Sequence, residues 1–128
     1  MGAFYTGFDY KNRKNGYFKI GETQDKTPAA RLSAIRQTDS FQCLGYLLLK
    51  NETLAERRYV ESYVRMMMEK THPELTQVQN DHFTYTIDPT RKYEQAQAYA
   101  ETALRYAMQC CDENKISYEI GTKVYKRG

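Results

Sequence analysis

The chain has 128 residues, a formal net charge of +3 and 41% hydrophobic residues, values that fit one globular domain. No apolar run approaches the roughly 20 residues of a membrane span, and the N-terminus lacks a signal-peptide pattern. Three cysteines, two of them adjacent, argue against a disulfide framework. We therefore expect one soluble cytoplasmic domain, with no membrane partner and no disulfide-linked partner. A charge of +3 does not by itself establish a nucleic-acid partner.

The first two predicted strands form a hairpin. Residues 3–8 (AFYTGF) and 17–21 (YFKIG) are rich in aromatics and of strand length. The polar segment 9–16 between them ends in Asn-Gly, which is a typical hairpin turn. Strand alternation directs one set of side chains to the core, namely Phe4, Phe8, Phe18 and Ile20. The opposite face then collects two phenols and an ammonium group, those of Tyr5, Tyr17 and Lys19.

A helix and a third strand are expected next. Thr27 is a good N-cap and Pro28 a good first helical residue, so a helix is predicted through about residue 38. Arg31 and Arg36 lie on the two flanks of its apolar seam, and periodicity does not choose between them. The mostly apolar run 42–50 (QCLGYLLLK) predicts a central strand.

The following segment, residues 52–70, has apolar residues at helical spacing. At about 100° per residue, one arc of this helix also includes the carboxylate of Glu56. An ionised carboxylate that faces the core must be paired, hydrogen-bonded or bound to a cation. Two interpretations stay open for Glu56: a structural ion pair with a neighbouring arginine, and a metal ligand. The apolar members of the arc are Ala55, Tyr59, Tyr63, Met66 and Met67.

The C-terminal third continues the mixed pattern. Residues 72–79 contain Pro73 and predict a loop, and residues 80–87 return to strand-like alternation. Asp88-Pro89 precedes a predicted helix at about 90–112, and residues 116–125 have the composition of a late edge strand. The chain shows no repeat and no linker. We therefore expect a single α+β domain over residues 1–128, with a small antiparallel sheet flanked by helices.

This order of elements and motifs resembles the GIY-YIG endonuclease superfamily over residues 2–83, with residues 88–128 as an added C-terminal helix and strand. Ala3-Phe4-Tyr5 matches GIY with only the tyrosine kept, and Lys19-Ile20-Gly21 matches YIG in a KIG variant. Arg31 follows Gly21 by ten residues, at the place of the family's catalytic arginine. Glu56 resembles the family's metal-binding glutamate, and Asn80 corresponds to a polar residue before a closing aromatic.

The resemblance implies a metal-dependent endonuclease that hydrolyses phosphodiester bonds in DNA, with Mg²⁺ or Mn²⁺ at Glu56. Arg31 would hold non-bridging phosphate oxygens, and Tyr5 would accept the proton of the attacking water. Lys19 would either favour the phenolate of Tyr5 or contact phosphate directly, and Tyr17 would supply the phenol that the KIG variant lacks. The remaining implied residues are Asn80 in the catalytic set and Lys11, Arg13 and Lys14 as contacts to the nucleic-acid backbone.

Two other classes of function remain open from the sequence. The first is a non-catalytic domain of the same fold that binds nucleic acid or a protein partner, for example in phage–host regulation. The second is an unrelated small α+β interaction protein. An inward-facing Glu56 close to Arg31 would favour the endonuclease over both.

Overall fold

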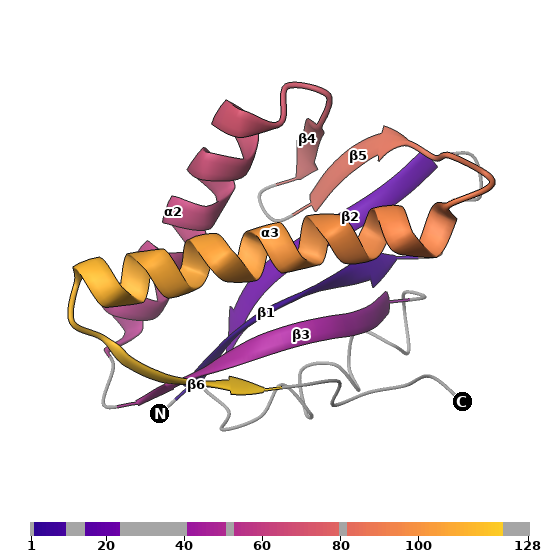
Figure 1. Ribbon diagram of the computed structural model, residues 1–128. Coiled ribbons are helices and arrows are strands. Elements are labelled where there is room, and N and C mark those ends of the chain that lie inside the picture. Colours follow the sequence, from indigo (N-terminus) through magenta and orange to yellow (C-terminus); the bar gives the residue numbers. More distant parts are fainter. Residues whose placement is uncertain (1, 10–14, 24–40, 51–52, 80–81, 122–128) are drawn as a thin grey trace.

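The computed structural model describes residues 2–9, 15–23, 41–50, 53–79 and 82–121. These residues form a six-stranded antiparallel sheet and two helices (Figure 1). In chain order the elements are β1 (Gly2–Asp9), β2 (Asn15–Thr23), β3 (Phe41–Lys50), α2 (Leu54–Thr71), β4 (Thr76–Gln79), β5 (His82–Thr86), α3 (Lys92–Glu113) and β6 (Ser117–Gly121).

The strand order across the sheet is β4-β5-β2-β1-β3-β6. The antiparallel β1–β2 pair was predicted. The predicted third strand β3 belongs to the same sheet and pairs with β1, and the predicted late edge strand β6 pairs with β3. Helices α2 and α3 pack against each other and against the same face of the sheet (Figure 1). The expected α+β fold, an antiparallel sheet flanked by helices with an added C-terminal helix and strand, is confirmed.

Strand alternation sorts the side chains of the central strands onto two faces. The helix-covered face carries the core residues Phe4, Phe18 and Ile20, as predicted; the side chain of Phe8 is not among those described. Tyr5 and Lys19 lie on the other face, where they are also buried. The core continues through β3, β5 and both helices, including Leu47, Leu49, Val60, Val64, Met68 and Phe83.

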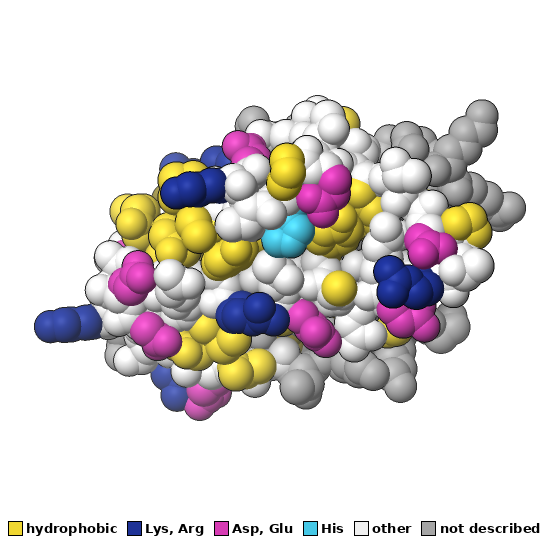
Figure 2. Space-filling view, turned by 45° about the horizontal axis from the view of Figure 1, so that its top comes forward, with side chains coloured by type: hydrophobic (Ala, Val, Ile, Leu, Met, Phe, Trp, Pro, Cys, Tyr) yellow, Lys and Arg dark blue, Asp and Glu magenta, His cyan; other side chains and the backbone are white. Residues whose placement is uncertain are grey.

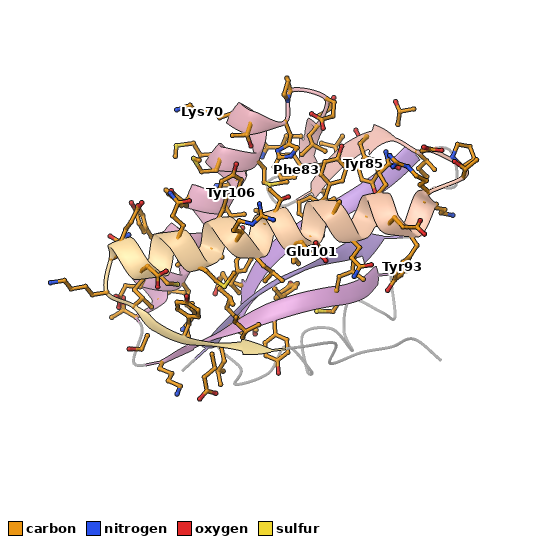
Figure 3. The ribbon with its side chains drawn as sticks, viewed as in Figure 1. Lys70, Phe83, Tyr85, Tyr93, Glu101 and Tyr106 are labelled. Carbon is orange, nitrogen blue, oxygen red and sulfur yellow. The ribbon has the colours of Figure 1, made fainter. Side chains whose placement is uncertain are left out.

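Helix α3 approaches the sheet closely because its inner face is built of small residues. Ala96, Ala100, Ala103 and Ala107 recur at helical spacing and are all buried. Larger side chains of the sheet also contact α3: the ring of Tyr85 of β5 lies tilted against that of Tyr99 of α3, with ring centroids 4.7 Å apart. Figure 3 shows the labelled Phe83 and Tyr85 side chains on the helix side of β5. The alanines therefore set the spacing between α3 and the sheet.

Three glycines in the sheet are paired directly with tyrosines on the neighbouring strand: Gly21 with Tyr5, Gly16 with Tyr85, and Gly121 with Tyr46. A Cβ atom on these glycines would lie 2.5, 2.2 and 2.0 Å from the nearest atom of the paired tyrosine ring. Each ring therefore occupies the space that a side chain on the opposite strand would need. Such aromatic–glycine pairs cover the glycine backbone and add cross-strand packing.

Two local predictions were wrong. Asn15-Gly16 does not form the hairpin turn but belongs to β2, where Asn15 pairs with Thr86 and Gly16 with Tyr85 of β5. The segment predicted as a loop over residues 72–79 contains the short strand β4, which pairs with β5 at the edge of the sheet. In both places, pairing with a strand distant in sequence outweighs the local turn or loop signal.

The predicted inner face of α2 was also wrong. The buried stripe is Arg57, Val60, Val64 and Met68, whereas of the predicted apolar arc Tyr59 and Met66 are exposed and only Tyr63 packs against the core. The charge that faces inward is therefore Arg57 rather than Glu56. Its Nε donates a hydrogen bond to Glu22 Oε2 of β2 at 2.9 Å, and the two side chains are 10% and 19% exposed. This ion pair attaches the start of α2 to the end of β2.

Replacing Arg57 by Met tests this ion pair. The change keeps an apolar stem but leaves the mostly buried Glu22 carboxylate without its guanidinium, so we expect a loss of about 2 kcal/mol in the free energy of unfolding. Urea denaturation followed by circular dichroism measures the loss. Arg58→Met, at the exposed neighbouring position, is the control and should be nearly neutral. Equal losses in the two variants would contradict the assigned role.

Candidate functional site

The candidate site begins on the sheet face opposite the helices, where β1 and β2 run side by side. The pairing register places Tyr5 across from Gly21 and Gly7 across from Lys19, so Lys19 is the diagonal neighbour of Tyr5 on the same face. Parity in the sequence predicted this placement. The tyrosine and lysine side chains are 1% and 5% exposed. A phenol and an ammonium group thus share one buried patch.

Gly21 is needed at its position because of Tyr5. A Cβ atom there would lie 2.5 Å from Tyr5 Cζ and 2.6 Å from its hydroxyl oxygen. Since the ring is buried, it has little room to move aside. The glycine of the Lys19-Ile20-Gly21 motif therefore allows the tyrosine of the first strand to cross the second strand. No local sequence pattern indicates this contact between two strands.

Glu56 lies in the first turn of α2, because the helix begins at Leu54 rather than at residue 52. Its side chain forms a capping box with Thr53: the backbone N–H of Thr53 donates to Glu56 Oε1 at 2.9 Å, and the N–H of Glu56 donates to Thr53 Oγ1 at 3.2 Å. Glu56 is half-buried. Its carboxylate is thus hydrogen-bonded within the helix terminus and also favoured there by the helix dipole.

The inward charge that sequence reasoning missed is Arg57. The signal was present, because Arg57 precedes Val60, Val64 and Met68 at the spacing of one helical face. Arg57 has a structural role, because it forms an ion pair with Glu22. The buried ion pair on α2 is therefore made by Arg57 and not by the preceding residue, Glu56, for which an ion pair was one of the two interpretations.

Several predicted site residues lie outside the residues that the structure describes. These are Arg31, Asn80 and the three basic residues Lys11, Arg13 and Lys14. Tyr17 belongs to β2 and pairs with Asp9 and Thr84, but its side chain is not described. Of the predicted set, the described side chains therefore bring together Tyr5 and Lys19, while Glu56 belongs to the N-terminus of α2 on the helix-covered side of the sheet.

Within the described ranges, no three or more His, Cys, Asp and Glu side chains form a group that could hold a metal ion. Neither of the described helices has the length and apolar character needed to cross a membrane. An open hollow of about 500 Å³ lies where α3 ends and β6 begins, and none of its described lining residues belongs to the predicted site. These residues are Cys111, Asp112, Lys115, Ile116, Ser117 and Tyr118.

All three cysteines are free and buried. Burial raises the pKa of the Cys43 thiol to about 11, and that of Cys110 also to about 11. Burial, followed by the neighbouring groups of Cys110, Asp112 and Glu56, raises the pKa of Cys111 to about 12. Because the thiolate is the reactive form, these thiols are poorly suited to nucleophilic chemistry.

We expect the three thiols to resist a water-soluble thiol reagent in the native protein at mildly alkaline pH, since both burial and the raised pKa values disfavour thiolate. Absorbance titration with dithionitrobenzoate measures the reaction. The same protein in concentrated guanidinium chloride is the control, where all three should react. Rapid reaction of any thiol in the native state would contradict the burial of these side chains.

Replacing Gly21 by Ala tests the contact beneath Tyr5. The added methyl group overlaps the buried ring, so we expect a loss of about 2 kcal/mol in the free energy of unfolding. Urea denaturation measures it. Gly121→Ala is the comparison variant: it also lies under a tyrosine ring, but Tyr46 is only partly buried and pairs with the edge strand β6, so its ring has more room to adjust and the loss should be smaller. A Gly21 variant as stable as the wild type would contradict the contact.

The chain was compared with protein-family models, with curated proteins and with solved structures, and none of them matches it.

Proposed function

We propose that the chain is a metal-dependent endonuclease of the GIY-YIG type that hydrolyses phosphodiester bonds in DNA. The observation that carries the proposal is the arrangement of Tyr5, Lys19 and Gly21 on one face of the β1–β2 pair, with the tyrosine ring directly over the glycine. The GIY-YIG resemblance assigns roles to Tyr5 and Lys19 and includes Gly21 in the KIG motif. The antiparallel sheet and the helix that follows β3 provide the framework that the resemblance implies.

In this proposal the residues act on a phosphodiester of the bound DNA. Tyr5, as the phenolate, accepts the proton of the attacking water and becomes the neutral phenol, and Lys19 holds a non-bridging phosphate oxygen by charge-assisted hydrogen bonding. Arg31 adds a guanidinium that stays charged at any physiological pH. DNA must approach the face that carries Tyr5 and Lys19, so the activity requires that these buried side chains become accessible when substrate binds.

A single carboxylate at Glu56 is compatible with magnesium, which commonly takes only one or two protein carboxylates and fills its remaining positions with water and phosphate. The capping box uses Oε1 of Glu56, so the other carboxylate oxygen would be the ligand. A Mg²⁺ or Mn²⁺ ion held there would supply Lewis acidity to a phosphate. Because Glu56 belongs to α2 on the helix-covered side of the sheet and Tyr5 and Lys19 lie on the opposite face, the proposal also requires that α2 or the substrate bring these groups to one phosphate.

The alternative is a non-catalytic domain of the same fold that binds nucleic acid or a protein. Two observations favour it. Tyr5 and Lys19 are almost completely buried, and the carboxylate of Glu56 already has a structural role as a helix cap. Side chains with these roles need no substrate to explain their presence.

Glu56→Gln separates the two functions. Glutamine also forms capping boxes, so α2 keeps its N-terminal hydrogen bonds while the charge that would hold a cation is removed. Under the endonuclease proposal, we expect cleavage of supercoiled plasmid with Mg²⁺ or Mn²⁺ to fall on the order of a hundredfold or more, with an unchanged unfolding midpoint. Gel electrophoresis of the plasmid, with EDTA as the metal-free reaction, measures it.

Glu69→Gln on the exposed side of the same helix is the matched control and should cleave at the wild-type rate. A wild-type protein that binds DNA but cuts no substrate with either metal would establish the binding alternative. Equal cleavage by the Glu56 variant and the wild type would remove Glu56 from the site even if the protein proved to be a nuclease.

A further inference from the structure

Helix α2 has a second apolar side that lies largely outside the core. Tyr59 and Met66 lie on it and are 51% and 52% exposed, among the most exposed large hydrophobic side chains of the described residues. Tyr63, which contacts the ring of Tyr59, and Met67 border them on the side toward α3. Figure 2 shows hydrophobic side chains gathered on this part of the surface, over α2. We call Tyr59, Tyr63, Met66 and Met67 the outer stripe.

The exposed members of the outer stripe, Tyr59 and Met66, do not attach α2 to the domain, although Tyr63 at its border also packs against the core. The opposite side of the helix already does so through Val60, Val64 and Met68, together with the Arg57–Glu22 ion pair. A helix that is apolar on both sides is normally covered on both sides. An exposed apolar stripe of this kind is typical of a surface that another molecule covers.

Charged residues lie at both ends of the stripe. Glu56 is in the first turn of α2 and Lys70 in the last. At about 100° per residue, Glu56 and Lys70 lie within roughly 20° of members of the stripe around the helix axis. These two charged residues therefore continue the stripe at its ends and do not lie along its sides. In Figure 3 the Lys70 side chain extends from the far end of α2, while Tyr106 of α3 lies beside the helix. The stripe thus has an acidic end, an apolar middle and a basic end.

Because of this order of charges, the stripe of one copy is complementary to the stripe of a second copy whose α2 helix runs in the opposite direction. We propose that two copies of the chain associate through their α2 helices, packed antiparallel about a two-fold axis near Ser62 and Tyr63. Tyr59 then faces Met66 of the second copy, an aromatic–sulfur contact, and Lys70 faces the first turn of the other helix, where Ala55 and Glu56 lie. A parallel arrangement would instead place Lys70 against Lys70 and Glu56 against Glu56.

The contact area also limits the strength of the association. One helical stripe, even with Tyr106 at its border, corresponds to the small interfaces of transient complexes, so we expect a dimer that forms at micromolar or higher concentration. The proposal rests on the exposed face of α2 alone and does not depend on the proposed endonuclease activity.

Sedimentation velocity over a wide concentration range tests the association. The wild type should rise from 15.0 kDa toward twice that mass. Met66→Lys, at a half-exposed position, should raise the dimer dissociation constant on the order of tenfold or more, because a lysine cannot be solvated within an apolar contact. Tyr59→Ser should act in the same direction, and far-UV circular dichroism verifies that both variants are folded.

Tyr93→Lys is the matched control, since Tyr93 is similarly exposed but lies on α3 outside the outer stripe, and it should associate like the wild type. A wild type that stays at 15.0 kDa throughout would overturn the proposal and leave the stripe to a partner of different chemistry. Equal association by Met66→Lys and the wild type would overturn it as well.

The direction of packing is tested with a short thiol cross-linker. A mixture of Tyr59→Cys and Met66→Cys proteins should give mainly the mixed dimer, because antiparallel packing brings position 59 of one copy to position 66 of the other. The three native cysteines are buried, and cross-linking of the wild-type chain measures the background that they contribute. Cross-linking that is stronger within either single variant would indicate parallel packing and overturn the antiparallel geometry.

Discussion

The Arg57–Glu22 ion pair fixes the rotation of α2 about its own axis, and the two surfaces of functional interest depend on that rotation. With Arg57 turned toward β2, Val60, Val64 and Met68 enter the core and Tyr59 and Met66 face outward. The same rotation places Glu56 at the edge of the buried stripe, where it caps the helix and remains half-buried. A rotation by one residue would bring Glu56 inward and bury the tyrosine and methionine side chains instead.

The strands could be predicted from sequence because their signals are local. Alternation in residues 3–8 and 17–21 gave the hairpin and correctly separated Phe4, Phe18 and Ile20 from Tyr5 and Lys19. The rotation of α2 could not be predicted in this way, because the helix has two apolar arcs and only tertiary contact decides which one is buried. The larger side chains suggested the wrong arc. The buried arc instead contains the smaller Val60 and Val64 together with Arg57 and Met68.

Other features depended on contacts between residues far apart in sequence. The Asn15-Gly16 pair has the composition of a tight turn, yet pairing with β5 holds it in an extended strand. The capping box at Thr53 and Glu56 has the spacing that defines the motif in sequence, and recognising it would have explained the carboxylate of Glu56 without a metal or an ion pair. That explanation and a metal-binding role are compatible, because a capping carboxylate has a second oxygen.

The three tyrosine–glycine pairs also bear on how the sheet selects its alignment during folding. Sliding β1 along β2 by two residues preserves which side chains face the core, so the hydrophobic pattern alone does not reject such a slip. It would, however, move the Tyr5 ring from Gly21 onto Lys19 or Thr23, both of which carry side chains on that face. Comparable overlaps would arise between β2 and β5 and between β3 and β6. In each of these strand pairs the tyrosine ring therefore fits opposite the glycine in the native alignment. This requirement excludes the two-residue slips that burial of apolar surface alone would tolerate.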